Sequence, residues 1–101
     1  MTLRNEQSEF AKRLPLLLLY IIVQGYEITF GDFKATTGHS ENSFHYKRLA
    51  ADINLFKDGK YLKLTEDHKQ FGLFWENLGG SWGGRWNDGN HYSWGEDGSS
   101  S

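Results

Sequence analysis

The residues best suited to chemistry in this chain are two histidines and two aspartates in two separate segments. His45 and Asp52 lie seven positions apart, and Asp88 lies three positions before His91 in the segment Asp88-Gly-Asn-His91. A catalytic zinc ion needs about three imidazole or carboxylate ligands and one open position for water. His45, Asp52 and His91 can supply that set.

A hydrolytic zinc site also needs a group that is not a ligand, which takes a proton from the attacking water and passes it to the leaving amine. Asp88 is placed for this role, because it shares a short segment with His91. Each of these residues alone has a simpler interpretation, since a single aspartate in a strand is more often a solvated side chain or a turn partner. The predicted metal site therefore depends on the two segments together.

The amino-acid composition excludes several other kinds of site and partner. The chain has no cysteine, which excludes disulfides, thiolate nucleophiles and cysteine-based zinc sites. Its formal net charge of -2 gives no reason for tight phosphate binding, and the adjacent pair Lys47-Arg48 is too small to change this, so we expect no nucleic-acid partner. A length of 101 residues fits one domain, predicted over residues 1–101 with a flexible tail at 95–101.

The apolar run at residues 14–23 is the only segment that suggests a membrane. It is shorter than the roughly 20 apolar residues that cross a bilayer, and its flanks lack the basic region and cleavage site of a secretory signal. We therefore predict a buried helix here, with no stable membrane insertion and no signal peptide.

Two segments are predicted to be helical. Residues 3–24 carry apolar side chains at steps of three and four and stop at Gly25, while Pro15 either kinks this helix or begins a second one. The later helix is predicted to have Thr65 as its N-cap and to end at Gly79-Gly80. Its apolar stripe consists of Phe71, Phe74, Trp75 and Leu78.

The clearest strand pattern covers residues 49–56, where apolar and polar positions alternate and Asp52 falls on the polar face. The Asp58-Gly59 turn signal and the return segment 61–64 complete a predicted hairpin. Shorter strands are expected at residues 26–30 and 91–94, with a loop at 81–90. Helices and strands that are segregated along the chain indicate an α+β fold with an antiparallel sheet and packed helices.

The two site segments resemble a known family. Ser43-Phe-His45-Tyr-Lys-Arg-Leu-Ala-Ala-Asp52 is similar to the Ser-x-His-x6-Asp signature of the zinc D,D-carboxypeptidases and L-alanyl-D-glutamate endopeptidases, and Asp88-x-x-His91 is similar to the second half of that site. The resemblance covers roughly residues 30–94 and is best with the short phage-endolysin branch. It implies the Hedgehog/D,D-peptidase fold, zinc on His45, Asp52 and His91, and Asp88 as the catalytic base.

The activity implied by the resemblance is hydrolysis of a peptide bond in the peptidoglycan stem, as an L-alanyl-D-glutamate endopeptidase of the phage-lysis type. Two alternatives stay open: a D-alanyl-D-alanine carboxypeptidase, and a non-catalytic wall-binding module that zinc stabilises. A phage enzyme would be made in the host cytoplasm and act on the periplasmic cell wall. We expect a monomer that needs a separate holin-type partner to reach that wall.

Three further residues are candidates for substrate contacts. Longer relatives carry an arginine upstream of the first histidine, and the nearest basic residue here is Lys34, a point charge without the arginine fork. Ser43 matches the family motif, although capping of the local backbone explains it equally well. Trp86, with Trp82, Tyr92 and Trp94, is an aromatic candidate for a substrate groove, against packing of these rings in a tryptophan-rich core. The remaining histidines, His39 and His68, are predicted to be exposed.

Overall fold

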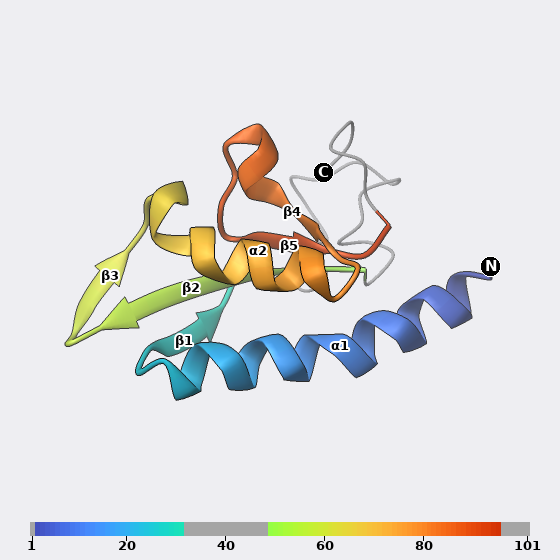
Figure 1. Ribbon diagram of the computed structural model, residues 1–101, viewed down its shortest axis with the longest axis horizontal. Helices are drawn as coiled ribbons and strands as arrows, with labels where there is room; N and C mark the ends of the chain where they lie inside the picture. Colours follow the sequence, from blue (N-terminus) through green and yellow to red (C-terminus); the bar gives the residue numbers. More distant parts are fainter. Residues whose placement is uncertain (1, 32–48, 96–101) are drawn as a thin grey trace.

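The computed structural model describes residues 2–31 and 49–95, which form one antiparallel sheet and two α-helices (Figure 1). The strand order in this part of the chain is β1-β2-β5-β4, and β3 also pairs with β2. The predicted α+β class is confirmed. In chain order the elements are α1 (Leu3–Val23), β1 (Glu27–Phe30), β2 (Ala50–Lys57), β3 (Lys60–Leu62), η1 (Thr65–His68), α2 (Lys69–Asn77), β4 (Ser81–Trp82), η2 (Gly83–Trp86) and β5 (His91–Ser93), where η1 and η2 are 3-10 helices.

Several predictions from sequence concern positions outside the described residues. These are the proposed ligand His45, the substrate candidates Ser43 and Lys34, His39, and residues 96–101 of the predicted tail. The structure therefore bears on the site through Asp52, Trp86, Asp88 and His91.

Helix α1 is one continuous helix that passes through Pro15, so no second helix begins there. The Thr2 side chain caps its start by accepting a hydrogen bond from the Asn5 N–H at 3.1 Å. The prediction that residues 14–23 are buried is wrong for half of them. One face of this helix lies in the core and the opposite face is exposed, because a helix on the surface of a small domain buries only the face that packs against the rest of the protein. The exposed apolar residues of this run are Leu16, Leu19, Ile22 and Val23.

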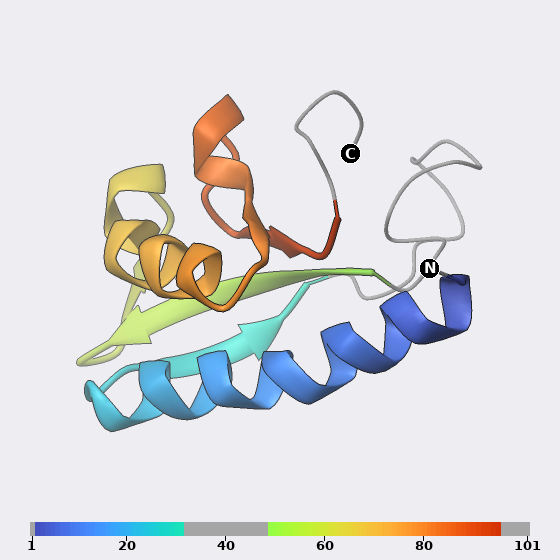
Figure 2. The same cartoon turned by 45° about the vertical axis from the view of Figure 1, so that its right-hand side comes forward.

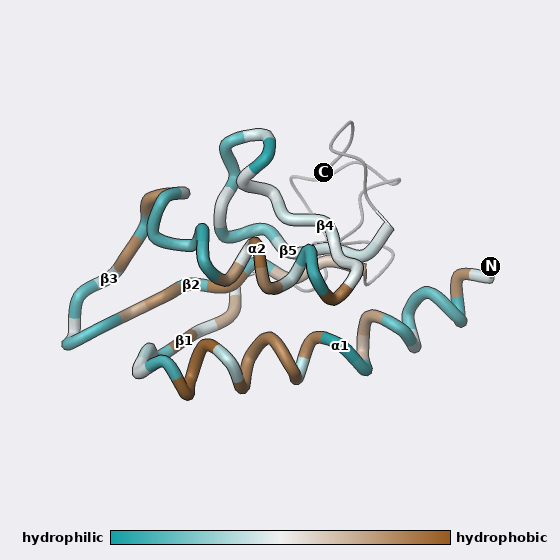
Figure 3. The backbone as a smooth tube through the Cα atoms, viewed as in Figure 1, coloured by the Kyte–Doolittle hydropathy of each residue, from teal (hydrophilic) through white to brown (hydrophobic). Residues whose placement is uncertain are grey.

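The apolar content of α1 is concentrated in its second half, as the brown colouring in Figure 3 shows. No helix in the described part of the chain is both long and apolar enough to cross a bilayer.

Strand β2 is the centre of the sheet, because it pairs with β1, β3 and β5. Its side chains alternate as predicted: Ala51, Ile53 and Leu55 are fully buried in the core, and Asp52 is half-buried on the other face. The turn from β2 to β3 is formed by Asp58 and Gly59, with φ of 54° and 77°. Positive φ at both positions is the geometry of a two-residue hairpin turn.

The helix predicted to begin at Thr65 is divided into η1 and α2. Thr65 is not its N-cap; the first turn is instead closed by Asp67, whose carboxylate accepts the Leu64 N–H at 3.0 Å. The loop predicted at 81–90 also contains structure, since it includes β4 and η2. A two-residue strand and a single 3-10 turn are too short to give a periodic sequence signal.

The two helices share one core with the sheet and contact each other (Figure 2). The Phe10 ring meets Trp75 edge-on with centroids 5.9 Å apart, and Tyr20 stacks on Phe74 at 4.2 Å. Arg13 joins α1 to the end of α2 by donating from Nε to the Leu78 carbonyl at 3.1 Å. The helices therefore cover the face of the sheet that carries Ala51, Ile53 and Leu55. They do not cover the face that carries Asp52.

Candidate functional site

Asp52 and His91 lie directly opposite each other on neighbouring strands. The antiparallel register of β2 and β5 pairs Asp52 with His91, and it pairs the adjacent residues Ala51 and Tyr92. Because Ala51 and Tyr92 are in the core, Asp52 and His91 are on the face of the sheet away from the helices. The distance between His91 Nδ1 and Asp52 Oδ1 is 3.3 Å.

The two side chains differ in their access to solvent. His91 is only 1% exposed, whereas the Asp52 side chain is 22% exposed. The imidazole is thus held in place by surrounding protein while the carboxylate reaches the surface. A buried nitrogen donor beside a partly open oxygen donor is a suitable pair for a metal ion that must also admit substrate.

The spacing of these two atoms fits zinc. Zinc–nitrogen and zinc–oxygen bonds of about 2.0–2.2 Å at tetrahedral angles place two ligand atoms roughly 3.3–3.5 Å apart. In this structure Nδ1 and Oδ1 are joined by a hydrogen bond of 3.3 Å, and the same separation is compatible with both atoms binding one zinc ion. The described residues contain no group of three or more potential ligands, and the third predicted ligand, His45, lies outside them.

Asp88 belongs to a tight turn that leads into His91. Its N–H donates to the Gly83 carbonyl at 2.8 Å, and its carbonyl accepts the His91 N–H at 3.1 Å. A Cβ on Gly83 would lie 2.2 Å from the Asp88 carbonyl oxygen and 2.7 Å from the His91 Cβ. Glycine is therefore required at position 83 for the backbone of η2 to approach this turn.

Gly89, which follows Asp88, is held from two sides. Its N–H donates to Thr65 Oγ1 at 3.2 Å, and its carbonyl accepts a hydrogen bond from Trp82 Nε1 at 2.8 Å. A Cβ at this position would lie 2.6 Å from the Thr65 Cα, so only glycine allows η1 to come this close. The backbone around Asp88 is thus fixed by contacts from β4, η1 and η2.

Trp86 lies beside His91. Their ring centroids are 5.9 Å apart with an interplanar angle of 61°, so one ring meets the other edge-on. Trp86 Nε1 is buried, and it is the one buried side-chain nitrogen or oxygen atom of the described residues that lacks a hydrogen-bond partner. The other aromatic candidates pack into or against the core: Trp82, Tyr92 and Trp94.

His68 is buried, which corrects the prediction that it is exposed. It is 1% exposed, and its Nδ1 makes a hydrogen bond of 2.9 Å with the hydroxyl of Tyr92. Burial lowers the pKa of His68 to about 4, although the nearby Asp67 carboxylate acts in the opposite direction. The spacing to Phe71 and Trp75, three and seven positions on, was the available signal, because it places His68 on the apolar face of the helix.

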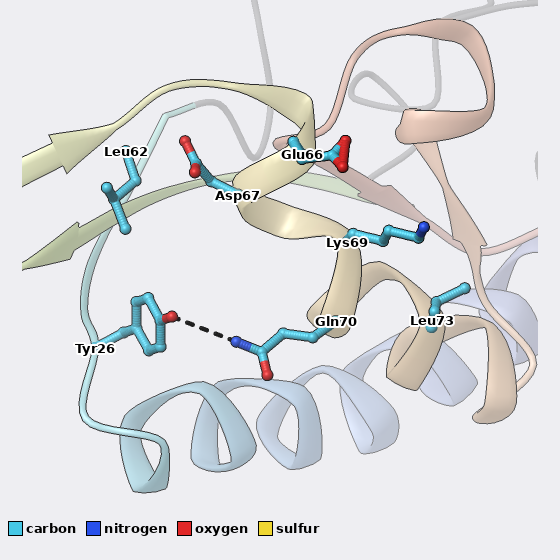
Figure 4. Close-up of a pocket in the computed structure, with 7 residues that line it drawn as sticks. All are labelled: Tyr26, Leu62, Glu66, Asp67, Lys69, Gln70 and Leu73. Carbon is cyan, nitrogen blue, oxygen red and sulfur yellow. Dashed lines mark hydrogen bonds between the residues drawn. The ribbon is translucent and has the colours of Figure 1, made fainter.

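A separate pocket of about 450 Å³ lies between η1, α2, the end of β3 and the connection from α1 to β1, which contributes Tyr26 (Figure 4). Its lining includes Glu66, Asp67 and Lys69, and it is crossed by a hydrogen bond of 3.4 Å from Gln70 Nε2 to the Tyr26 hydroxyl. None of the residues predicted to act in the site lines this pocket. The chemistry is therefore expected at the sheet face and not in this cavity.

Comparison with known proteins agrees with the resemblance noted in the sequence. A family profile described as D-alanyl-D-alanine carboxypeptidase matches residues 37–94, which is more than half of the 101 residues and includes both site segments. No curated protein and no solved structure matches the chain significantly. The predicted family is confirmed: this chain belongs to the D-alanyl-D-alanine carboxypeptidase family of M15 peptidases.

Proposed function

We propose that this protein is a zinc peptidase that hydrolyses a peptide bond in the peptidoglycan stem, with His45, Asp52 and His91 as ligands and Asp88 as general base. The observation that supports this most directly is the cross-strand pair Asp52–His91, whose donor atoms are 3.3 Å apart. The backbone bond of 3.1 Å from His91 to Asp88 adds a carboxylate to the same turn. Metal-assisted hydrolysis requires about three ligands and a separate base. The pair would supply two of the ligands, His45 the third, and Asp88 the base.

The residues would divide the reaction between them. Zinc, when bound, would polarise the scissile carbonyl and favour ionisation of a water molecule. Asp88 would take the proton of the attacking water and deliver it to the leaving amine. His91, held rigidly by burial, would keep its imidazole oriented throughout, and Asp52 would face the solvent side from which substrate enters.

Substrate contacts are proposed for three residues. The Trp86 ring meets the His91 ring edge-on with centroids 5.9 Å apart, which supports a role as an aromatic contact for the peptide beside the metal site. Lys34 and Ser43 are proposed from the family motif alone. Lys34 would attract a substrate carboxylate, and Ser43 would orient the segment that carries His45.

The bond we favour is the one between L-alanine and D-glutamate, as in phage endolysins. The aspartate at position 88 supports this, because many relatives of the family have a glutamate there and an aspartate suggests the endolysin-like branch. The description of the matching family favours the alternative, removal of a terminal D-alanine. We further propose that the protein acts as a monomer on the cell wall of a bacterial host, with a holin-type partner to provide access.

Zinc content and wall lysis test the proposed function together. We expect about one zinc per chain and loss of turbidity in outer-membrane-permeabilised Gram-negative cells for the wild type. His91→Ala should lose both the metal and the lysis. Asp88→Asn should keep the metal and lose turnover by roughly 10²- to 10⁴-fold, the usual contribution of general acid–base catalysis. Wild-type turnover in Asp88→Asn would refute the assigned base.

Product analysis on a defined stem peptide then identifies the bond. Release of free D-alanine would establish the carboxypeptidase, and new termini at L-alanine and D-glutamate would establish the endopeptidase. A protein that binds zinc and cell walls without cleaving either bond would instead be a wall-binding module.

A further inference from the structure

We infer that the 3-10 helix η1 is a positioning clamp for the catalytic turn: Thr65 fixes the backbone that carries Asp88, and His68 fixes the strand that carries His91. The inference rests on the proposed function, because it assumes a base at Asp88 and a ligand at His91. Thr65 and His68 are the first and last residues of η1. Neither was predicted from sequence to have any part in the site.

The Thr65 arm acts on the residue next to the proposed base. Thr65 Oγ1 accepts the Gly89 N–H at 3.2 Å, and the same hydroxyl lies 3.5 Å from Asn87 Oδ1, so the residues on both sides of Asp88 face Thr65. Trp82 Nε1 holds the Gly89 carbonyl from another direction at 2.8 Å. The peptide that links Asp88 to Gly89 therefore has little freedom to rotate.

The His68 arm acts on the residue next to the proposed ligand. His68 Nδ1 and the Tyr92 hydroxyl are 2.9 Å apart, and both residues are fully buried. A hydrogen bond between two buried side chains is costly to break, because each group would be left unsatisfied. Tyr92 lies in β5 directly after His91, so this bond fixes the position of the strand from the core side.

The spacing of the two holding residues on η1 equals the spacing of their partners. Thr65 and His68 are three residues apart on η1, and their partners Gly89 and Tyr92 are three residues apart on the clamped segment. Rigidity of η1 itself comes from the bond of 3.0 Å between the Leu64 N–H and the Asp67 carboxylate and from its direct continuation into α2. One short element thus holds both ends of the segment that runs from Asp88 to His91.

The arms should affect different measurable quantities. A displaced base slows proton transfer without changing metal binding, and misplacement by about 1 Å can lower a rate by roughly 10²-fold. A displaced ligand weakens metal binding. Losing a hydrogen bond made directly to a ligand lowers metal affinity by about 10- to 100-fold, and the His68–Tyr92 bond, which acts through the residue next to the ligand, is expected at the lower end of that range. A purely structural role of η1 would change both quantities together.

Thr65→Val tests the first arm, because valine keeps the shape of threonine and removes the hydroxyl. We expect kcat to fall by about 10- to 100-fold with KM and zinc affinity unchanged, and Thr65→Ser to restore kcat. Thr29→Val is the matched control, since its hydroxyl accepts a hydrogen bond from Asn54 Nδ2 at 3.2 Å on β1 and has no contact with the turn. Wild-type kcat is expected for this control.

Tyr92→Phe tests the second arm, because it removes the hydroxyl and keeps the ring in the core. We expect zinc affinity, measured by competition with a chelator, to fall by about tenfold. Tyr26→Phe is the matched control: it removes a hydroxyl that is bonded to Gln70 in the pocket of Figure 4, and its zinc affinity should equal that of the wild type.

Asp88→Asn separates failure of the inference from failure of the proposed function. If Asp88→Asn is inactive while Thr65→Val has wild-type kcat, the inference is overturned and the proposed function stands. If Asp88→Asn has wild-type turnover, the assignment of Asp88 as the base is overturned, and the inference about Thr65 with it. Equal losses of kcat and of zinc affinity in both Thr65→Val and Tyr92→Phe would also overturn the inference, because general loosening of the fold would then explain them.

Discussion

The two faces of the paired strands β2 and β5 differ in composition and in task. On the face that packs against the helices, Ala51, Ile53 and Tyr92 are 0% exposed. On the opposite face, Asp52 and His91 form a polar pair at 3.3 Å. Consecutive residues of one strand point to opposite faces, so the chain places a core residue and a site residue next to each other in sequence. Apart from Tyr92, whose hydroxyl we infer to hold β5 through His68, stability and chemistry are therefore separable by substitution, although they share the same strands.

The largest effect on stability is expected from a core-face truncation away from the site. Leu55→Ala should lower the free energy of unfolding by about 2–5 kcal/mol, because it leaves a cavity at a fully buried position. Turnover per folded molecule should stay at the wild-type level. Leu19→Ala, at a position that is 60% exposed, is the control and should change stability by less than about 0.5 kcal/mol. If Leu55→Ala lowered turnover of the folded fraction, the two faces of the sheet would not separate stability from chemistry. Chemical denaturation together with activity measurements checks both statements.

An intermediate effect is expected from pH, through His68. Its folded pKa of about 4 is below the unfolded value of 6.5, so the unfolded chain binds a proton that the folded chain excludes. Stability from this group is complete above about pH 6.5 and is lost as the pH falls towards 4, by up to about 3 kcal/mol. Asp67 and the Tyr92 hydroxyl are the polar groups that face the ring.

The control for this pH dependence is His68→Asn, which has no titrating group at that position. Its stability should change less between about pH 6.5 and 4 than that of the wild type, whatever its absolute stability. Denaturation of both proteins in the metal-free form, with a chelator present, gives the difference, in which other titrating groups cancel. If the stability of the two proteins changed equally with pH, the pKa of His68 would be the same in the folded and unfolded chain, and the prediction would be wrong.

The smallest effect is expected at the rim of the core. Arg13 donates to the Leu78 carbonyl and lies over the Trp94 ring at 4.9 Å, so Arg13→Ala should lower stability by about 1 kcal/mol through lost packing and a lost hydrogen bond. Lys12→Ala removes a side chain that is 67% exposed and should change stability little. Thermal melts of the two variants check this order, and equal shifts would contradict it.

The parts of the fold that sequence predicted depend on local patterns. The alternation along β2, the turn at Asp58-Gly59 and the apolar steps of α1 each follow from side chains a few residues apart. The direct pairing of Asp52 with His91 was not predicted, although both strands were. Register between strands that are far apart in the chain depends on which side chains pack together in the folded state.

The errors arose where a tertiary contact overrides a local preference. Thr65 has the side chain of a good N-cap, but its hydroxyl instead binds the Gly89 N–H, 24 residues away. His68 lies between Asp67 and Lys69 and looks solvated, but Tyr92 provides a buried partner that only the folded chain brings near. Side-chain hydrogen bonds between distant segments leave little trace in sequence, whereas Gly83 and Gly89 were at least visible as glycines in a loop.

The pairing of β2 with β5 also determines when the site comes into existence. Asp52 and His91 are 39 residues apart in the chain, so an unfolded molecule must close a long loop before both can meet one ion. The β2–β3 hairpin, by contrast, needs only a two-residue turn, and local contacts of that kind form faster than distant ones. Binding of the proposed metal should therefore follow assembly of the sheet during folding, and the proposed site would be incomplete in a newly synthesised chain until β5 has paired with β2.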